Sequence, residues 1–116
     1  MQIKKSKIKN HRVGLGFDVH KFSHKNKLLK LGGAVIPSSV SLEAVSDGDV
    51  LLHAVCDAIC GACLLGDIGD YFPPCAKESK NMDSRRIVEF VLEKISKKFK
   101  IVNIDITLIS DRKSVV

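Results

Sequence analysis

Residues 46–65, SDGDVLLHAVCDAICGACLL, contain the clearest helix pattern in the sequence. Asp47 and Asp49 flank a glycine at its start, and either carboxylate can accept hydrogen bonds from the free N–H groups of a first helical turn. From residue 50 onward the stretch is apolar on nearly every side, and Gly66 follows it. We therefore predict a buried helix over residues 50–65 that stops at Gly66.

Shorter patterns surround this helix on both sides. A second amphipathic helix is predicted from a cap at Asp83 or Ser84 to about residue 97, and residues 20–26 and 67–82 are predicted as loops. Strands are predicted from alternating side chains and nearby turn residues, over residues 12–19, 27–31, 34–36 and 101–109. This order predicts an α+β fold, a two-layer α/β sandwich in which a mixed sheet packs against helices.

The positive charge of the sequence is concentrated at its start. Five basic residues and no acidic residue occupy the first twelve positions, and without them the net charge of +6 falls to about +1. We therefore expect residues 1–11 to form a basic, disordered tail and residues 12–116 to form one domain. A nearly neutral body with few aromatic residues argues against a nucleic-acid partner.

The cysteines favour a reducing compartment. Cys56, Cys60 and Cys63 match the C-x3-C-x2-C spacing that holds an iron–sulfur cluster in radical S-adenosylmethionine enzymes. In a helix, however, this spacing spreads the thiols over about 10 Å, so we favour packing in the core.

No apolar run is long enough for a signal peptide or a membrane span, and we expect a cytoplasmic protein without a membrane partner.

Asp18, His20 and His53 form the candidate metal site. Side chains two residues apart on a strand share a face, so Asp18 and His20 converge, while His53 lies in the first turn of the buried helix. Two imidazoles and one carboxylate match a zinc site with one open position. Spacing alone leaves a second interpretation open, in which His20 is a loop residue, His53 a core residue and Asp18 a turn residue.

Two more acidic residues are placed around the candidate ligands. Asp57 lies one helical turn beyond His53, where its carboxylate can accept the free ring N–H of that histidine and fix its orientation. Asp49 stands at the start of the same helix. Both are predicted to support the ligands without binding the metal themselves.

Three motifs in order resemble a known enzyme family. Residues 12–20 (RVGLGFDVH), 46–54 (SDGDVLLHA) and 65–73 (LGDIGDYFP) are similar to the motifs of 2-C-methyl-D-erythritol 2,4-cyclodiphosphate synthases, enzymes of non-mevalonate isoprenoid synthesis. Asp83-Ser84 and residues 103–107 (NIDIT) continue the likeness, which extends over about residues 12–109. Several motifs in register are far more specific than any one of them.

The resemblance implies a site and a reaction. Asp18, His20 and His53 match the family's ligands for a divalent metal ion, zinc, while Ser46, Asp67 and Gly69 match its substrate-binding positions. The implied reaction is a metal-dependent intramolecular phosphoryl transfer, which converts a CDP-methylerythritol 2-phosphate to the 2,4-cyclodiphosphate and releases CMP. A second divalent ion (Mg or Mn) on the diphosphate and a homotrimer with shared active sites are also implied.

The sequence departs from the family pattern at three places. Val45 replaces a histidine and Pro74 an acidic residue, which removes one phosphate contact and weakens recognition of the erythritol. Residues 110–114 (SDRKS) stand where the family continues into its nucleotide loop and the ligand of the second metal. We therefore expect a member without the C-terminal part of the fold. The alternative is a catalytically impaired remnant that still binds zinc and trimerises.

Overall fold

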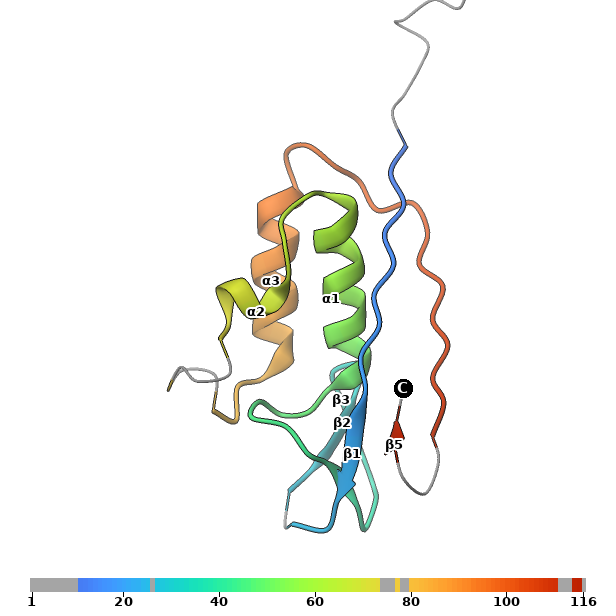
Figure 1. Cartoon of the computed structure of the whole chain (residues 1–116), viewed down its shortest axis with the longest axis vertical. Helices are drawn as coiled ribbons and strands as arrows, with labels where there is room; N and C mark the ends of the chain where they lie inside the picture. The colour runs from blue at the N-terminus through green and yellow to red at the C-terminus, as the bar shows by residue number, and fades with distance from the viewer. Residues whose placement is uncertain (1–10, 26, 74–76, 78–79, 111–113, 116) are drawn as a thin grey trace, which may run out of the picture.

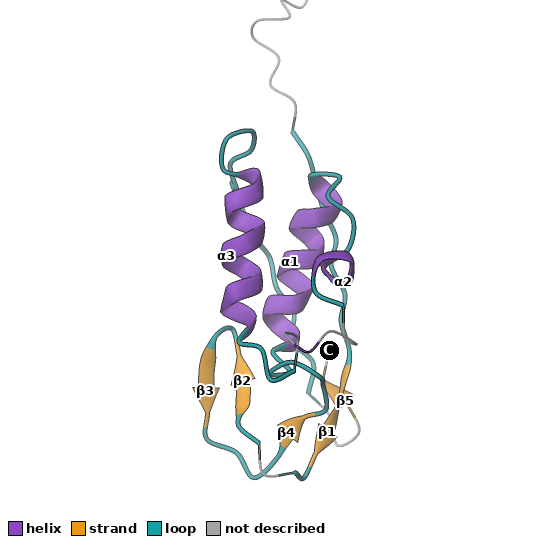
Figure 2. Cartoon of the chain, turned by 90° about the vertical axis from the view of Figure 1, so that its left-hand side faces the viewer, coloured by secondary structure: helices purple, strands orange, loops and turns teal. Residues whose placement is uncertain are grey.

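The computed structural model describes residues 11–25, 27–73, 77, 80–110 and 114–115. Two long helices, α1 (Val50–Ala62) and α3 (Ser84–Ile95), lie side by side, and the short α2 (Ile68–Tyr71) lies beside them. The strands gather beyond one end of the helices (Figures 1 and 2). Their bounds are β1 (His20–Ser23), β2 (Leu29–Leu31), β3 (Ala34–Ile36), β4 (Ser41–Leu42) and β5 (Ser114–Val115).

The start of α1 follows from its capping residue, as predicted. Asp49 is the N-cap, and its fully buried carboxylate accepts a hydrogen bond from the backbone N–H of Leu52 at 3.1 Å. The same carboxylate accepts the backbone N–H groups of Gly32 and Gly33 at 2.9 and 2.7 Å. Both glycines have positive φ, 65° and 82°, as the tight turn between β2 and β3 requires. Asp49 therefore ties this hairpin to α1.

The main core lies between the two long helices. Cys56 and Cys60 of α1 pack with Ile87 and Val91 of α3 and with Met82, and all five side chains are buried. This confirms core packing for Cys56 and Cys60, whereas Cys63, which follows the last residue of α1, is partly exposed. The second predicted helix is confirmed as α3, whose ends lie within two residues of the predicted ones, and Asp83 is its N-cap.

The sheets are small and antiparallel. One has the strand order β4-β1-β5, with Phe22 opposite Leu42 and His20 opposite Val115, and the other is the hairpin of β2 and β3. A second core cluster beneath them centres on Leu42 and Val50. The α+β prediction is confirmed, but every strand pair among the described residues is antiparallel, so the sheet is not mixed there.

Four predicted segments differ from the structure. Residues 12–19 and 101–109 contain no assigned strand, because alternation alone does not supply the neighbouring strand that a ladder requires. Val13 and Leu15 are instead 93% and 91% exposed. Conversely, β1 occupies residues predicted as loop, and α2 forms inside the loop predicted over residues 67–82. The sequence prediction missed this helix because it has only four residues and lies among residues typical of caps and turns.

Two further expectations concern the ends of the chain and membranes. The predicted tail, residues 1–11, lies outside the described residues except for His11, and Pro74 lies outside them as well. None of the described helices combines the length and apolar character that a membrane crossing needs.

Candidate metal centre

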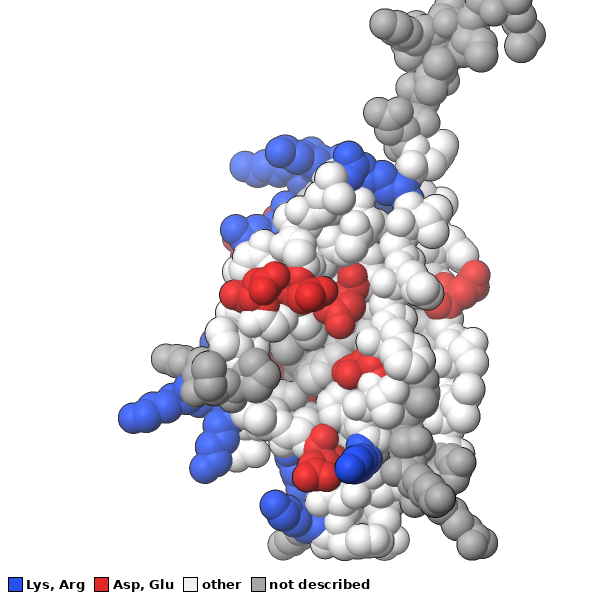
Figure 3. Space-filling model, in the orientation of Figure 1, with Lys and Arg blue, Asp and Glu red and all other residues white. Residues whose placement is uncertain are grey.

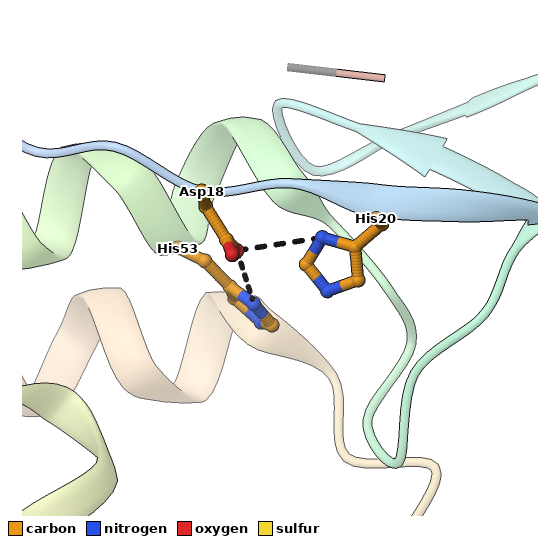
Figure 4. A group of neighbouring side chains, drawn as sticks. All are labelled: Asp18, His20 and His53. Atoms are coloured by element: carbon orange, nitrogen blue, oxygen red, sulfur yellow. Dashed lines mark ion pairs between the residues drawn. The ribbon is translucent and has the colours of Figure 1, made fainter. Parts of the chain in front are cut away.

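Asp18, His20 and His53 converge on one point although they come from separate parts of the chain. Figure 4 shows the Asp18 carboxylate directed between the two imidazole rings. Its Oδ2 atom lies 3.4 Å from Nδ1 of His20 and 3.3 Å from Nδ1 of His53. One potential ligand atom from each residue lies within 4.8 Å of the others. The sequence prediction that these three side chains meet is confirmed.

Two glycines bring Asp18 to α1. A Cβ atom on Gly14 would lie 1.8 Å from the carbonyl oxygen of Ala58, and one on Gly16 would lie 1.8 Å from that of Ala54. Only glycine therefore lets the extended segment before β1 run directly against the backbone of the helix. This contact places Asp18 beside His53, which immediately precedes Ala54 in the chain.

The spacing of the three side chains fits a small divalent cation. Donor atoms at zinc–ligand distances of 2.0–2.2 Å in a tetrahedron lie about 3.4 Å from one another, close to both measured separations. A charge-assisted hydrogen bond to Asp18 would be shorter, at about 2.8 Å. Nδ1 of His20 is moreover buried and has no hydrogen-bond partner among the residues that the structure describes. A metal ion would satisfy that atom.

The protonation of His20 is consistent with a role as a metal ligand. Burial lowers the pKa of His20, and the neighbouring Asp18 opposes the effect only in part. A lowered pKa favours the neutral imidazole, which is the form that coordinates metals. The side chains of His20 and His53 are only 11% and 13% exposed, so the site is also largely shielded from water.

The far side of the His53 ring is held by two serines. Its Nε2 atom lies 2.8 Å from Oγ of Ser84 and 3.3 Å from Oγ of Ser46. Asp57, which we predicted to accept this ring N–H, instead accepts the backbone N–H of Ile68 at 3.3 Å. That prediction was wrong because α2, absent from the sequence prediction, brings its own unpaired N–H to the Asp57 carboxylate.

The three predicted substrate-binding residues lie at different places. Ser46 lines a cavity of about 240 Å³ beside His20 and His53, and Val45 borders the same cavity. Asp67 and Gly69 lie at the start of α2, where the space next to the Gly69 Cα is open. The structure brings Ser46 to the candidate ligands. In α2 it is Ile68, the residue between Asp67 and Gly69, that lines the cavity.

Sequence reasoning missed two features of this site. One is the apolar wall of the cavity, which Ile68, Phe72, Met82 and Ile87 form. The other is the role of Ser84, which the sequence analysis treated only as part of a helix cap. No local signal could have indicated this role, because Ser84 and His53 are 31 positions apart in the sequence.

Acidic side chains lie near the candidate ligands. Figure 3 shows acidic side chains across the middle of this face and basic side chains toward its ends. Burial raises the pKa of Asp57, and repulsion from Asp67 and Asp18 adds to that effect. An anionic ligand would meet repulsion here unless a cation intervened.

Known proteins with similar sequences share one name. The 2-C-methyl-D-erythritol 2,4-cyclodiphosphate synthase of Francisella philomiragia is 50% identical over 100 residues, which cover 85% of this chain and 63% of that protein. The protein of that name from Clostridioides difficile is 49% identical, with 85% and 62% covered. The chain thus spans somewhat less than two thirds of the length of these relatives.

Solved structures show the same similarity in three dimensions. A 2C-methyl-D-erythritol-2,4-cyclodiphosphate synthase described as a CDP-bound form has a TM-score of 0.67 at 34% identity and covers 75% of this chain and 57% of its own. The bifunctional IspDF of Campylobacter jejuni has the same TM-score at 42% identity, covering 73% and 23%. A family profile matches residues 11–115, nearly the whole chain. The chain belongs to the YgbB family.

Proposed function

We propose that this chain acts as a metal-dependent cyclodiphosphate synthase of isoprenoid biosynthesis. The observation that carries the proposal is the convergence of Asp18, His20 and His53, together with the buried Nδ1 of His20, which accepts or donates no hydrogen bond among the described residues. The names of the relatives support the reaction class.

The proposed substrate is a CDP-methylerythritol 2-phosphate. One oxygen of its 2-phosphate forms a bond to the β-phosphorus, and the bond from that phosphorus to the bridging oxygen breaks. CMP leaves with that oxygen, and the 2,4-cyclodiphosphate remains. The attacking oxygen is already anionic, so the reaction needs no general base from the protein. The CDP in a solved structure of a similar synthase supports a nucleotide diphosphate as the ligand.

The acidic surroundings explain why such a site requires a metal. Asp18, Asp57 and Asp67 would repel a substrate with several phosphate charges. A zinc ion held by Asp18, His20 and His53 would supply positive charge to the transferring phosphoryl group, with a second Mg or Mn ion on the diphosphate. Ser46 on the cavity side, with Asp67 and Gly69 at the start of α2, would hold the substrate. The apolar wall would contact its carbon chain.

An assembly of several copies is part of the proposal. Among the described residues, large apolar side chains are exposed along two extended segments, including Val13, Leu15, Phe17, Val102 and Ile106. Continuous apolar surface of this kind is typical of a protein interface. A homotrimer in the cytoplasm, where the thiols of Cys56, Cys60 and Cys63 stay free, agrees with these features.

Release of CMP tests the proposed activity. The full chain, supplied with zinc, magnesium and the CDP-linked substrate, is expected to release CMP and form the cyclic diphosphate in equal amounts. His53→Ala should lower the rate by at least about 100-fold, since it removes a metal ligand. A chain that binds zinc and assembles but releases no CMP would be a non-catalytic remnant, and the proposed activity would be wrong.

A further inference from the structure

A chain of short hydrogen bonds leads from His53 away from the candidate metal position. Nε2 of His53 lies 2.8 Å from Oγ of Ser84, and that oxygen lies 2.5 Å from Oδ1 of Asp47. Ser84 is fully buried and Asp47 is 7% exposed. Neither residue lies among the candidate ligands, and the phosphoryl transfer described above gives neither of them a role.

The Asp47 carboxylate can only accept in this arrangement. Its oxygens receive the backbone N–H of Ser84 at 2.8 Å and that of Asp49 at 3.1 Å, and the ammonium of Lys30 lies 3.9 Å away. Two of these neighbours donate hydrogen bonds to the carboxylate, and the third carries positive charge. The Ser84 hydroxyl likewise donates to Oδ1 of Asp47.

A serine hydroxyl has a single proton, and this fixes what Ser84 can do for His53. Once the proton points at Asp47, only a lone pair of Oγ remains for the imidazole. Nε2 of His53 must then carry the ring proton and donate it to Ser84. In a neutral imidazole with Nε2–H, the other nitrogen, Nδ1, presents a lone pair. Nδ1 is the atom that lies 3.3 Å from Oδ2 of Asp18, on the side of the candidate metal.

We propose that Asp47 and Ser84 are positioning residues, which set the tautomer of His53 so that its Nδ1 lone pair faces the metal. The inference rests on the metal site of the proposed function. The rival tautomer would place the proton on Nδ1 and donate it to Asp18, which would block coordination. The distances favour Nε2–H, because its contact with Ser84 is 0.5 Å shorter than the Nδ1 contact with Asp18.

The hydrogen bonds of Ser46 agree with this assignment. Its Oγ accepts the backbone N–H of Gly48 at 3.3 Å and lies 3.3 Å from Nε2 of His53. The Ser46 oxygen is therefore a second acceptor for the same ring proton, at a longer distance than the Ser84 oxygen. Ser84 differs from Ser46 because its hydroxyl is oriented by a buried carboxylate, and it therefore imposes the direction of the whole chain of hydrogen bonds.

Nitrogen NMR of the histidine rings tests the proposal without metal. In the metal-free full chain at about pH 8, where an ordinary imidazole is neutral, the wild type is expected to show the proton of His53 on Nε2. In Ser84→Ala an Nδ1–H population should appear. A wild-type protein with the proton on Nδ1 would overturn the proposal, and this measurement does not depend on how any variant folds.

Zinc affinity supplies the second readout. Ser84→Ala should raise the zinc Kd by about 10- to 100-fold, the usual effect of losing an outer partner of a ligand. Ser41→Ala is the matched control, because Ser41 is equally buried but its hydroxyl has no hydrogen-bond partner in the described part of the chain. The control should leave both the zinc Kd and the His53 tautomer unchanged. If Ser84→Ala matched the control in both respects, the positioning role would be wrong.

The two readouts separate this inference from the proposed metal site. A wild-type chain that takes up no stoichiometric zinc would contradict the metal site, while the tautomer of His53 would still decide the role of Ser84. Conversely, zinc binding together with an Nδ1–H tautomer in the metal-free chain would leave the metal site standing and contradict the inference.

Discussion

Burial makes the thiol of Cys56 unreactive. The side chain is 1% exposed in the core between α1 and α3, and burial raises its pKa to about 12, with smaller contributions from Cys60 and Asp57. Since the thiolate is the reactive form, almost none is present at about pH 8. We predict that a thiol reagent leaves Cys56 and Cys60 unmodified in the native protein and modifies both in denaturant, as measured by peptide mass spectrometry. Rapid modification of native Cys56 would contradict the packing described for this core.

The convergence of the candidate metal ligands was predictable at the residue scale, but their surroundings were not. Asp18 and His20 are two residues apart in extended chain, and this spacing alone places them on one side. Ser84 reaches His53 across 31 positions of sequence, through the packing of α3 against α1. No local pattern encodes a contact of that kind. The Asp57 prediction was wrong for the same reason, because its partner belongs to another element.

The close contact between the segment before β1 and α1 gives a prediction at the scale of elements. In Gly16→Ala the new Cβ would lie 1.8 Å from a helix carbonyl oxygen, so the segment must move away and carry Asp18 with it. We expect at least a tenfold increase in the zinc Kd and a loss of about 1–3 kcal/mol in the free energy of unfolding. Calorimetric titration with zinc and denaturant unfolding measure the two effects.

Gly61→Ala is the control for that substitution. Gly61 lies within α1, and nothing stands within 4 Å of the position that its Cβ would take. Alanine there should leave zinc binding unchanged and raise helix stability by about 0.5–1 kcal/mol. If Gly16→Ala bound zinc as tightly as Gly61→Ala, the contact with α1 would not position Asp18.

Helices and hairpins were predictable where the residues that determine them lie within the same segment of sequence. Both long helices have a capping aspartate and a buried face in their own sequence, and the hairpin of β2 and β3 has its two glycines. The segments 12–19 and 101–109 alternate as strands do, yet a strand is defined by its neighbour. Neither segment pairs with a strand among the described residues, so their periodicity alone did not predict their structure.

Association is the prediction for the whole molecule. Leu15 is 91% exposed on a segment with several other exposed apolar side chains. We expect light scattering after size exclusion to give the mass of a trimer for the wild type. Leu15→Glu should shift the protein toward monomer, because a buried, unpaired carboxylate is costly at an interface. Glu89→Gln, on the helix α3 instead, is the control and should remain trimeric. A monomeric wild type at micromolar concentration would contradict the assembly.

Zinc content is the most direct test of the central claim, that Asp18, His20 and His53 together hold one metal ion. The full chain is dialysed against zinc and then against metal-free buffer, and the remaining metal is measured by mass spectrometry. The wild type should retain one zinc per chain, and His53→Ala should retain none while staying folded by circular dichroism. One zinc per chain in folded His53→Ala would contradict the assignment of this metal centre.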